Sequence, residues 1–239
     1  MRPSRSSAVS SSLTLIAGAA IVASVWFGFQ SQAAETPIIP APTADIAQDQ
    51  RATAVAVLAG GCFWGVQAVF QQVEGVKNAV SGYAGGAERD ANYDKVSAGA
   101  TRHAEAVRIT YDPRKISYGK ILQIYFSVAH DPTELNRQGP DVGPQYRSTI
   151  FPLDADQERI AKSYIAQLDA ARIYRRAIAT TIETDKPFYP AEGYHQDFMA
   201  KHPNHPYILA HDAPKIAHLM RIFPDVYRAK PVLTAHAAD

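Results

Sequence analysis

Apolar residues recur along this chain with two periods, one typical of strands and one typical of helices. A continuous apolar run at 54–59 predicts a buried strand. Residues 103–111 alternate with the two-residue period of a strand. Apolar side chains at helical spacing predict helices over 63–72 and 118–129, and Asp154 is placed to cap a helix from 155 to about 171. Weaker patterns predict strands at 76–83, 147–153 and 177–183, and short helices at 195–199 and 215–223.

The order of these segments indicates the fold class. Strands alternate with helices, but some consecutive strands have no helix between them. This order favours an α+β fold over a doubly wound parallel sheet. We expect a mixed sheet with helices packed on one side, in which a ferredoxin-like plait forms the core and carries extensions. One domain over residues 53–232, followed by a tail at 233–239, accommodates all of the segments.

A long segment without clear periodicity interrupts the domain at 130–146. It contains Pro132, Pro140 and Pro144 together with Gly139 and Gly143. We expect a loop without secondary structure of its own, and loops of this length in compact domains are usually functional or disordered.

The N-terminal residues have a different character from the rest of the chain. Arg2 and Arg5 precede an uncharged run at 13–29, and small residues follow at the Ser31-Gln32-Ala33 site. This pattern is typical of a cleaved signal peptide, here residues 1–33, and predicts export, with the periplasm as the expected location. The alternative is a membrane anchor formed by 13–29. Residues 34–52 contain three prolines and no periodicity, so we expect a disordered linker.

Composition excludes several classes of function. The net charge is +1 and no basic block occurs, which argues against a nucleic-acid partner. Five histidines gather between 195 and 218, but their spacing fits no compact ligand set, so we expect no metal. The chain also lacks a phosphate-binding or dinucleotide-binding glycine motif, and no cofactor is expected.

Cys62, the only cysteine in 239 residues, lies in Gly60-Gly61-Cys62-Phe63-Trp64, between the first predicted strand and the first predicted helix. The free N–H groups at a helix N-terminus favour an anion, so we expect a lowered thiol pKa and a nucleophilic role. A buried, inert cysteine is the alternative.

Few other side chains could serve a thiol nucleophile. Glu105 lies on the alternating strand; if it faces inward, burial raises its pKa and makes it a proton donor, and if it faces outward it is a surface glutamate. Tyr93, Asp141 and Tyr146 could hydrogen-bond a polar substrate.

Phe63 and Trp64 directly follow the cysteine. They could form an apolar pocket beside the nucleophile or simply pack into the core, and their spacing does not separate these readings.

Residues 54–223 resemble one family, peptide methionine sulfoxide reductase A. The resemblance is carried by a cysteine motif, an acid motif and several tyrosine segments, found in consistent order. They are Gly61-Cys62-Phe63-Trp64-Gly65, Gly82-Tyr83-Ala84-Gly85-Gly86, Tyr93, Gly99, His103-Ala104-Glu105-Ala106-Val107, Tyr111-Asp112-Pro113, His130-Asp131-Pro132, Arg137-Gln138, Asp141 to Ser148, and Phe188-Tyr189 to Tyr194-His195-Gln196.

The resemblance implies an enzyme, a peptide-methionine (S)-S-oxide reductase, that repairs oxidised proteins by reducing the S epimer of methionine sulfoxide, free or in proteins. By the same resemblance, Cys62 attacks the sulfoxide sulfur and becomes a sulfenic acid, while Glu105 protonates the oxygen. Tyr93 and Tyr146 hydrogen-bond that oxygen with support from Asp141, and Phe63 and Trp64 hold the methyl group.

The chain departs from the family in one respect. Family members often carry further cysteines that resolve the sulfenic acid, whereas this chain has none. An outside thiol, from a thioredoxin-like or glutaredoxin-like donor, must then regenerate Cys62. We expect a monomer. A cysteine hydrolase and a non-catalytic binding module with a structural cysteine are the competing hypotheses.

Overall fold

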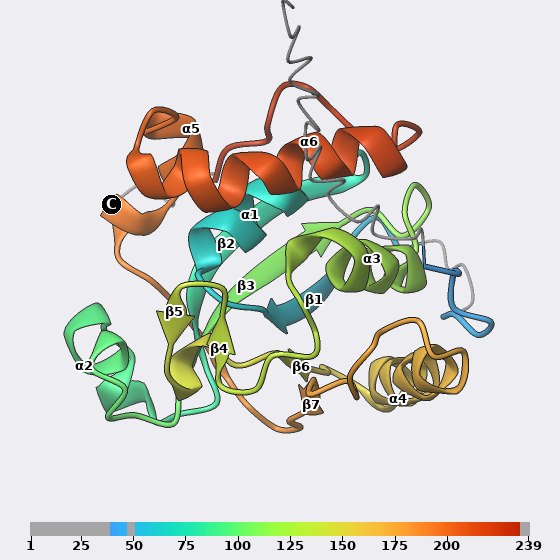
Figure 1. The fold of residues 1–239 in the computed structure, drawn as a ribbon, viewed down its shortest axis with the longest axis horizontal. Coiled ribbons are helices and arrows are strands. Elements are labelled where there is room, and N and C mark those ends of the chain that lie inside the picture. The colour runs from blue at the N-terminus through green and yellow to red at the C-terminus, as the bar shows by residue number, and fades with distance from the viewer. Residues whose placement is uncertain (1–38, 47–50, 235–239) are drawn as a thin grey trace, which may run out of the picture. The chain divides into compact units, whose positions relative to one another are not determined.

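A computed structural model describes residues 39–46 and 51–234 of the chain (Figure 1). Its centre is a six-stranded sheet with the strand order β7-β6-β1-β3-β2-β8. The strands are β1 (Ala54–Ala59), β2 (Val76–Ala84), β3 (Ala104–Tyr111), β6 (Thr149–Phe151), β7 (Thr181–Ile182) and β8 (Phe188–Pro190). Only β6 and β7 pair in parallel, and the other neighbours are antiparallel. The sheet is therefore mixed, as predicted.

The helices differ greatly in length. They are α1 (Phe63–Gln71), α2 (Tyr93–Ser97), α3 (Tyr118–Ile124), α4 (Ala155–Ala170), α5 (Phe198–Lys201) and α6 (Ala213–Ile222). Side chains cap three of them, and at α2 Asn92 Oδ1 accepts from Lys95 N–H at 3.1 Å. Ser117 Oγ accepts from Lys120 N–H at 3.1 Å and Asp154 Oδ1 accepts from Gln157 N–H at 2.8 Å. Each cap satisfies an N–H group that has no partner inside its helix.

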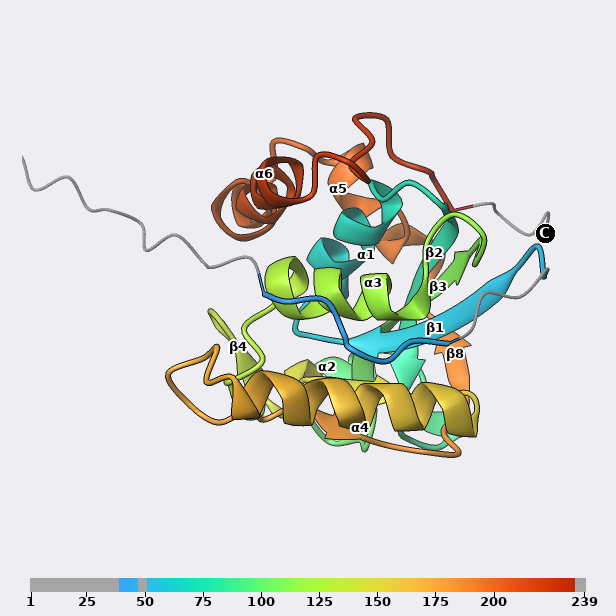
Figure 2. The ribbon, with the colours of Figure 1, turned by 90° about the vertical axis from the view of Figure 1, so that its right-hand side faces the viewer.

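The main core lies between the sheet and helices α1, α3 and α4 (Figure 2). Leu58 and Ile109 from the sheet meet Phe70 of α1, Leu122 of α3 and Ile160 of α4 in one buried cluster. A smaller cluster on other sheet positions contains mostly alanine and valine. The α+β architecture predicted from the order of segments is confirmed.

Several predicted elements are shorter than the hydrophobic pattern suggested. Of the strand expected at 147–153, only residues 149–151 form a strand. Of that expected at 177–183, only residues 181–182 do. Hydrophobicity reports burial, whereas a strand also needs a neighbour for its backbone groups, and β7 has a partner only on one side. The helix expected at 118–129 changes to π-helical geometry from Tyr125 to Ala129.

The segment 130–146 was expected to lack secondary structure, and this is wrong. β4 (Arg137–Gln138) and β5 (Asp141–Val142) form a two-stranded hairpin, and a 3-10 turn follows at Pro144–Tyr146. The hairpin tip is Gly139-Pro140, with Gly139 at φ +55. The residues that break helices and strands therefore make the turn that orders this segment.

The expectation of a disordered linker is also wrong for residues 39–46. Ile39 is 1% exposed, and its carbonyl accepts from Gln123 Nε2 at 2.7 Å. The Pro40 carbonyl accepts from Tyr164 Oη at 2.7 Å. The backbone carbonyls of this proline-rich segment are free to accept hydrogen bonds from helix side chains. The segment therefore packs along α3 and α4.

The proposed signal peptide at 1–33 lies outside the described residues, as does most of the tail at 233–239. Among the helices that the structure describes, none has the length and apolar character needed to cross a membrane.

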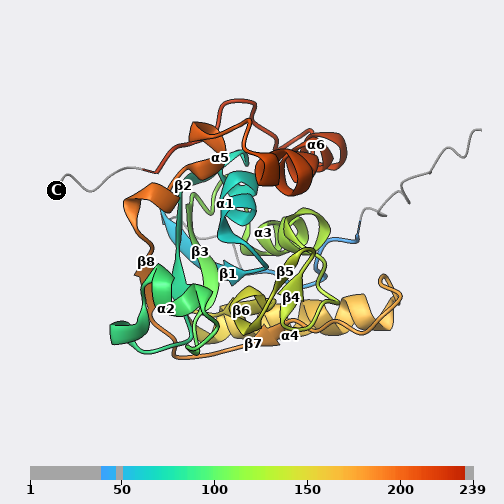
Figure 3. The same cartoon turned by 60° about the vertical axis from the view of Figure 1, so that its left-hand side comes forward.

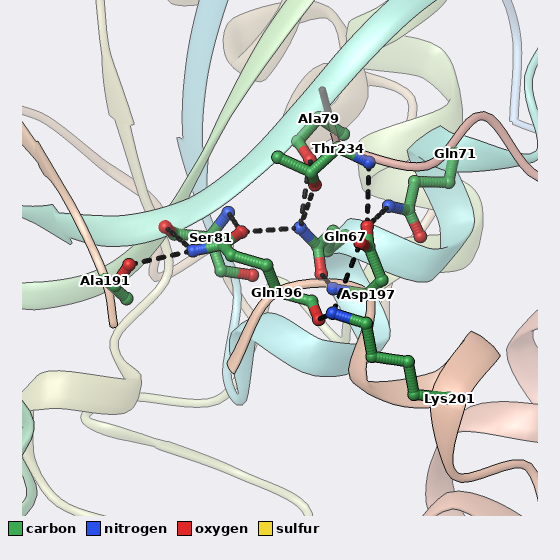
Figure 4. A network of polar contacts seen from close by, with 9 residues as sticks. All are labelled: Gln67, Gln71, Ala79, Ser81, Ala191, Gln196, Asp197, Lys201 and Thr234. Carbon is green, nitrogen blue, oxygen red and sulfur yellow. Dashed lines mark hydrogen bonds and ion pairs between the residues drawn. The ribbon is translucent and has the colours of Figure 1, made fainter. Parts of the chain in front are cut away.

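Residues 191–234, which we term the C-terminal arm, lie along α1 (Figure 3). A buried polar network joins the two (Figure 4). Gln67 Nε2 donates to Gln196 Oε1 at 2.9 Å, and Gln71 Nε2 donates to Asp197 Oδ1 at 2.7 Å. The N–H of Thr234 donates to the same Asp197 oxygen at 2.8 Å. The arm is thus fastened to the helix that begins at Cys62.

Candidate active site

Cys62 is the N-cap residue of α1 and is half-buried. Gly61, at φ +88, makes the turn from β1 into the helix. A side chain there would meet Gln138 of the β4–β5 hairpin at 2.5 Å, so only glycine fits. The turn places the thiol over the first helical N–H groups, and that of Trp64 donates to the sulfur.

Glu105 faces inward from β3 and is 2% exposed. Its Oε2 accepts from the backbone N–H of Phe63 at 3.0 Å, which ties the carboxyl to the first residue of α1, next to Cys62. Burial raises the pKa of Glu105 to about 8, opposed by this hydrogen bond and assisted by the charge of Asp141. A carboxyl group with that pKa holds a proton at neutral pH, as a general acid must.

The expected lowering of the Cys62 pKa is wrong for the free protein. Burial raises the pKa of the thiol well above 9.0, and the carboxylates of Glu105 and Asp212 raise it further. The Trp64 N–H and the charge of Lys215 oppose this but do not overcome it. The sequence showed the helix N-terminus and could not show the two acids that the fold brings beside it.

Tyr93 begins α2 and Tyr146 ends the 3-10 turn, and both are half-buried. Burial raises the pKa of each phenol, and the charges of Glu105 and Cys62 raise both further. These shared effects place the two hydroxyls near the thiol and the acid. The structure therefore brings together four of the predicted residues from four separate elements.

Asp141 occupies the first position of β5, and its carboxylate accepts a hydrogen bond from the Tyr207 hydroxyl. Burial raises the pKa of Tyr207, followed by the charge of Cys62 and the bond to Asp141. Sequence reasoning missed Tyr207, because no periodicity or charge pattern marks it among 12 tyrosines.

The two aromatics after Cys62 have different surroundings. Phe63 is 1% exposed and packs against Tyr83 and His195, with ring centroids 5.9 and 4.9 Å away. Trp64 is half-buried, stacks on Phe198 at 3.6 Å and donates from Nε1 to His195 Nδ1 at 3.1 Å. Trp64 therefore keeps part of its surface exposed, while Phe63 lies in the core.

A further carboxylate, which the sequence analysis did not single out, organises the periphery. Glu192 accepts from the Tyr93 N–H at 2.9 Å and from the Tyr83 hydroxyl at 2.8 Å. These bonds, with the charge of His195, lower its pKa despite the opposing effect of burial, which is the largest single influence. Glu192 thus fixes the start of α2, where Tyr93 lies.

Within residues 39–46 and 51–234, no group of histidine, cysteine, aspartate and glutamate side chains is arranged to hold a metal ion. The chemistry that the site supports is that of a thiol beside a protonated carboxyl group, with phenol hydroxyls and an indole around it.

Comparisons with known proteins agree with this arrangement. The family model described as peptide methionine sulfoxide reductase matches residues 54–225. A peptide methionine sulfoxide reductase MsrA 2 from Mesorhizobium japonicum is 60% identical over 77% of this chain and 94% of the relative.

Two solved structures are also similar. Reduced Mxr1 from Saccharomyces cerevisiae has a TM-score of 0.58 and 34% identity, over 66% of this chain and 90% of Mxr1. Methionine sulfoxide reductase A of Corynebacterium diphtheriae has a TM-score of 0.52 and 30% identity, over 70% of this chain and 85% of that protein. The chain therefore belongs to the peptide methionine sulfoxide reductase family, and it is an oxidoreductase that reduces methionine sulfoxide.

Proposed function

We propose that Cys62 and Glu105 together reduce the S epimer of methionine sulfoxide, with Cys62 as nucleophile and Glu105 as proton donor. One observation carries this assignment: the hydrogen bond at 3.0 Å from the Phe63 N–H to Glu105 Oε2. It holds the buried acid beside the residue that follows the thiol. A substrate sulfur at Cys62 would therefore place its oxygen toward the acid.

The chemical step balances with these two groups. The Cys62 thiolate attacks the sulfoxide sulfur, and Glu105 gives its proton to the sulfoxide oxygen. The sulfur–oxygen bond of the substrate and the newly formed bond between the two sulfurs then break, and the oxygen ends on Cys62 as a sulfenic acid. The substrate sulfur gains two electrons and leaves as methionine, and the cysteine sulfur loses two.

The surrounding side chains fit the two halves of the substrate group. Tyr93 and Tyr146 donate hydrogen bonds to the polar oxygen, and Asp141 supports them through its bond with Tyr207. Trp64 contacts the methyl group, and Phe63 packs beneath the apolar side of the pocket. The pocket is then half apolar and half donor, as the sulfoxide group is.

Regeneration requires a thiol from outside the chain, because Cys62 is the only cysteine. A donor thiolate attacks the sulfenic sulfur, forms a mixed disulfide and releases water, and a second thiol releases Cys62. A thioredoxin-like or glutaredoxin-like protein supplies both thiols. If residues 1–33 act as a signal peptide, as their sequence suggests, the enzyme and its donor work in the periplasm.

Mass spectrometry after a single turnover tests the proposal. The protein is mixed with one equivalent of the S epimer without reductant, and Cys62 should gain one oxygen atom or a dimedone adduct. The R epimer and a Cys62→Ser protein are the controls, and neither should give the adduct. Release of methionine by the Cys62→Ser protein would exclude the thiol mechanism.

A further inference from the structure

A buried ion pair from the C-terminal arm lies against the first turn of α1. Asp212 ends the π-helical turn Ile208–Asp212 and is fully buried. Lys215 lies one turn further along, in α6, and its Nζ is 3.2 Å from Asp212 Oδ1. The lysine side chain is only 19% exposed, so the pair is largely shielded from solvent and from salt.

Gly65 shows how closely the pair approaches the helix. It is the third residue of α1, just after Cys62 and the two aromatics. A side chain at Gly65 would begin 2.0 Å from Asp212 Oδ1 and 2.7 Å from Lys215 Nζ. The carboxylate and the ammonium group therefore occupy the space that a side chain at position 65 would need.

Packing alone does not explain this pair. Asp212 Oδ2 is buried and has no hydrogen-bond partner among the described residues. An unsatisfied buried polar atom typically costs about 1–3 kcal/mol, and more when it is charged. A purely structural pair could be replaced by apolar side chains at little cost, so its position beside a reactive thiol calls for another explanation.

The pair acts electrostatically on the Cys62 segment. The charge of Lys215 lowers the pKa of the Cys62 thiol and also that of His130, whose ring lies against Gly60. Asp212 raises the pKa of Cys62, and its effect on the thiol is larger than that of Lys215. Several titratable groups influence the Cys62 pKa or are influenced by the Cys62 charge: Glu105, Tyr93, Tyr146, Tyr207, Asp212 and Lys215. Lys215 is the cation in this set.

We propose that Asp212 and Lys215 are positioning residues for Cys62. Lys215 supplies the positive charge that stabilises the Cys62 thiolate, and Asp212 holds its ammonium group at Gly65, against the first turn of α1. The inference rests on the proposed nucleophilic role of Cys62. It assigns to Lys215 the charge that opposes the effects of Glu105 and Asp212 on the ionisation of the thiol.

The pH dependence of Cys62 alkylation by iodoacetamide tests the proposal without any turnover. Because the chain has one cysteine, the total alkylation rate reports that thiolate alone. Lys215→Met should raise the midpoint by about one pH unit, which is about tenfold less thiolate at a fixed lower pH. Asp212→Asn should lower the midpoint, because it removes a negative charge. Lys215→Arg should restore the parent value.

Matched variants separate this role from a structural one. Lys201 also pairs with a buried aspartate of the same arm, Asp197, at 3.5 Å, and Lys201→Met should leave the midpoint unchanged. Lys215→Gln, which keeps a donor for Asp212, serves if the methionine variant does not fold. An unchanged midpoint in the folded Lys215 variants would overturn the proposal. So would shifts of equal sign in the Lys215 and Asp212 variants, since disruption of packing does not depend on the sign of the lost charge.

Sulfenic acid formation is then measured on the same proteins. If the parent forms the sulfenic acid and the Lys215 variants keep the parent midpoint, the positioning role fails and the reductase mechanism stands. If no protein forms the sulfenic acid, the mechanism itself is wrong, whatever the midpoints show.

Discussion

Two buried carboxyl groups flank the first turn of α1, and they differ in what faces them. Glu105 comes from β3, in the middle of the sheet, and its partner is the uncharged backbone N–H of Phe63. Asp212 comes from the C-terminal arm, and its partner is the ammonium group of Lys215. Burial is the largest influence on both groups and raises the pKa of both carboxyls, but at Asp212 the charge and hydrogen bond of Lys215 oppose the rise, whereas Glu105 meets only an uncharged N–H. The same chemical group can therefore donate a proton on one side of the turn and hold a charge on the other.

The largest effect is expected when Glu105, the proposed proton donor, is replaced. Glu105→Gln keeps an oxygen for the Phe63 N–H but has no acidic proton. We expect sulfenic acid formation in a single turnover to slow by about 10²–10⁴-fold, which is the usual contribution of general acid catalysis, with little change in substrate affinity. Rapid-quench measurement of the Cys62 oxidation state gives both quantities.

Asp212→Asn is the control on the other side of the turn. It should change the rate of the same step far less, because Asp212 does not transfer a proton. Equal losses in the two variants would remove the distinction between the two carboxyl groups.

The second expectation concerns pH. In the proposed mechanism the reactive form has the proton on Glu105 and none on Cys62, so the pair must hold one proton in total. Since the Glu105 pKa is about 8 and the Cys62 pKa is higher, the doubly protonated form dominates below pH 8. The value of kcat/KM should therefore rise about tenfold per pH unit up to about pH 8, and fall only above the pKa of Cys62.

Stopped-flow assays on a good reducing donor measure this profile. In Glu105→Gln the break near pH 8 should vanish, because only the thiol still titrates. A parent enzyme whose kcat/KM already declines between pH 7 and pH 8 would contradict the order of the two pKa values.

The same two sides differ in how far sequence could predict them. Cys62 stood out as the only cysteine at a strand-to-helix turn, and the alternation of 103–111 placed Glu105 on a strand. Which face of that strand is buried depends on the helices that cover it, so the orientation of Glu105 stayed open until the fold was known. The pKa of Cys62 also depends on the fold: the sequence predicted a lowered pKa, but the structure places two carboxylates beside the thiol and the pKa is raised.

The sequence of the C-terminal arm carried almost no signal of its role at the site. Tyr207 and Asp212 lie in a segment without clear periodicity, and Lys215 only begins a weakly predicted helix. Each acts through a partner more than 60 residues away or through α1. The motifs that carry the family resemblance end at Gln196, so the resemblance gave Tyr207, Asp212 and Lys215 no role. Contacts between distant segments decide what such residues do, and no local pattern records those contacts.

The smallest effect on activity is expected where the arm is fastened, away from the thiol. Asp197 adopts a left-handed conformation at φ 60 and accepts hydrogen bonds from Gln71 Nε2 and the Thr234 N–H. Asp197→Ala leaves two buried donors unsatisfied and strains the backbone, so we expect a loss of about 2–4 kcal/mol in the free energy of unfolding. Asp197→Asn tolerates the left-handed conformation and keeps an acceptor, and should lose less than half of that.

Urea unfolding measures these losses, and kcat measured well below the unfolding transition should change less than about threefold in both variants. The result also distinguishes two ways in which the arm could serve the site. If the arm serves the site only through the pair at Gly65, loosening its far end lowers stability and spares the reaction. A large fall in kcat for folded Asp197→Ala would mean instead that the network through Gln67 and Gln71 transmits the position of the whole arm to Cys62, because α1 connects the two.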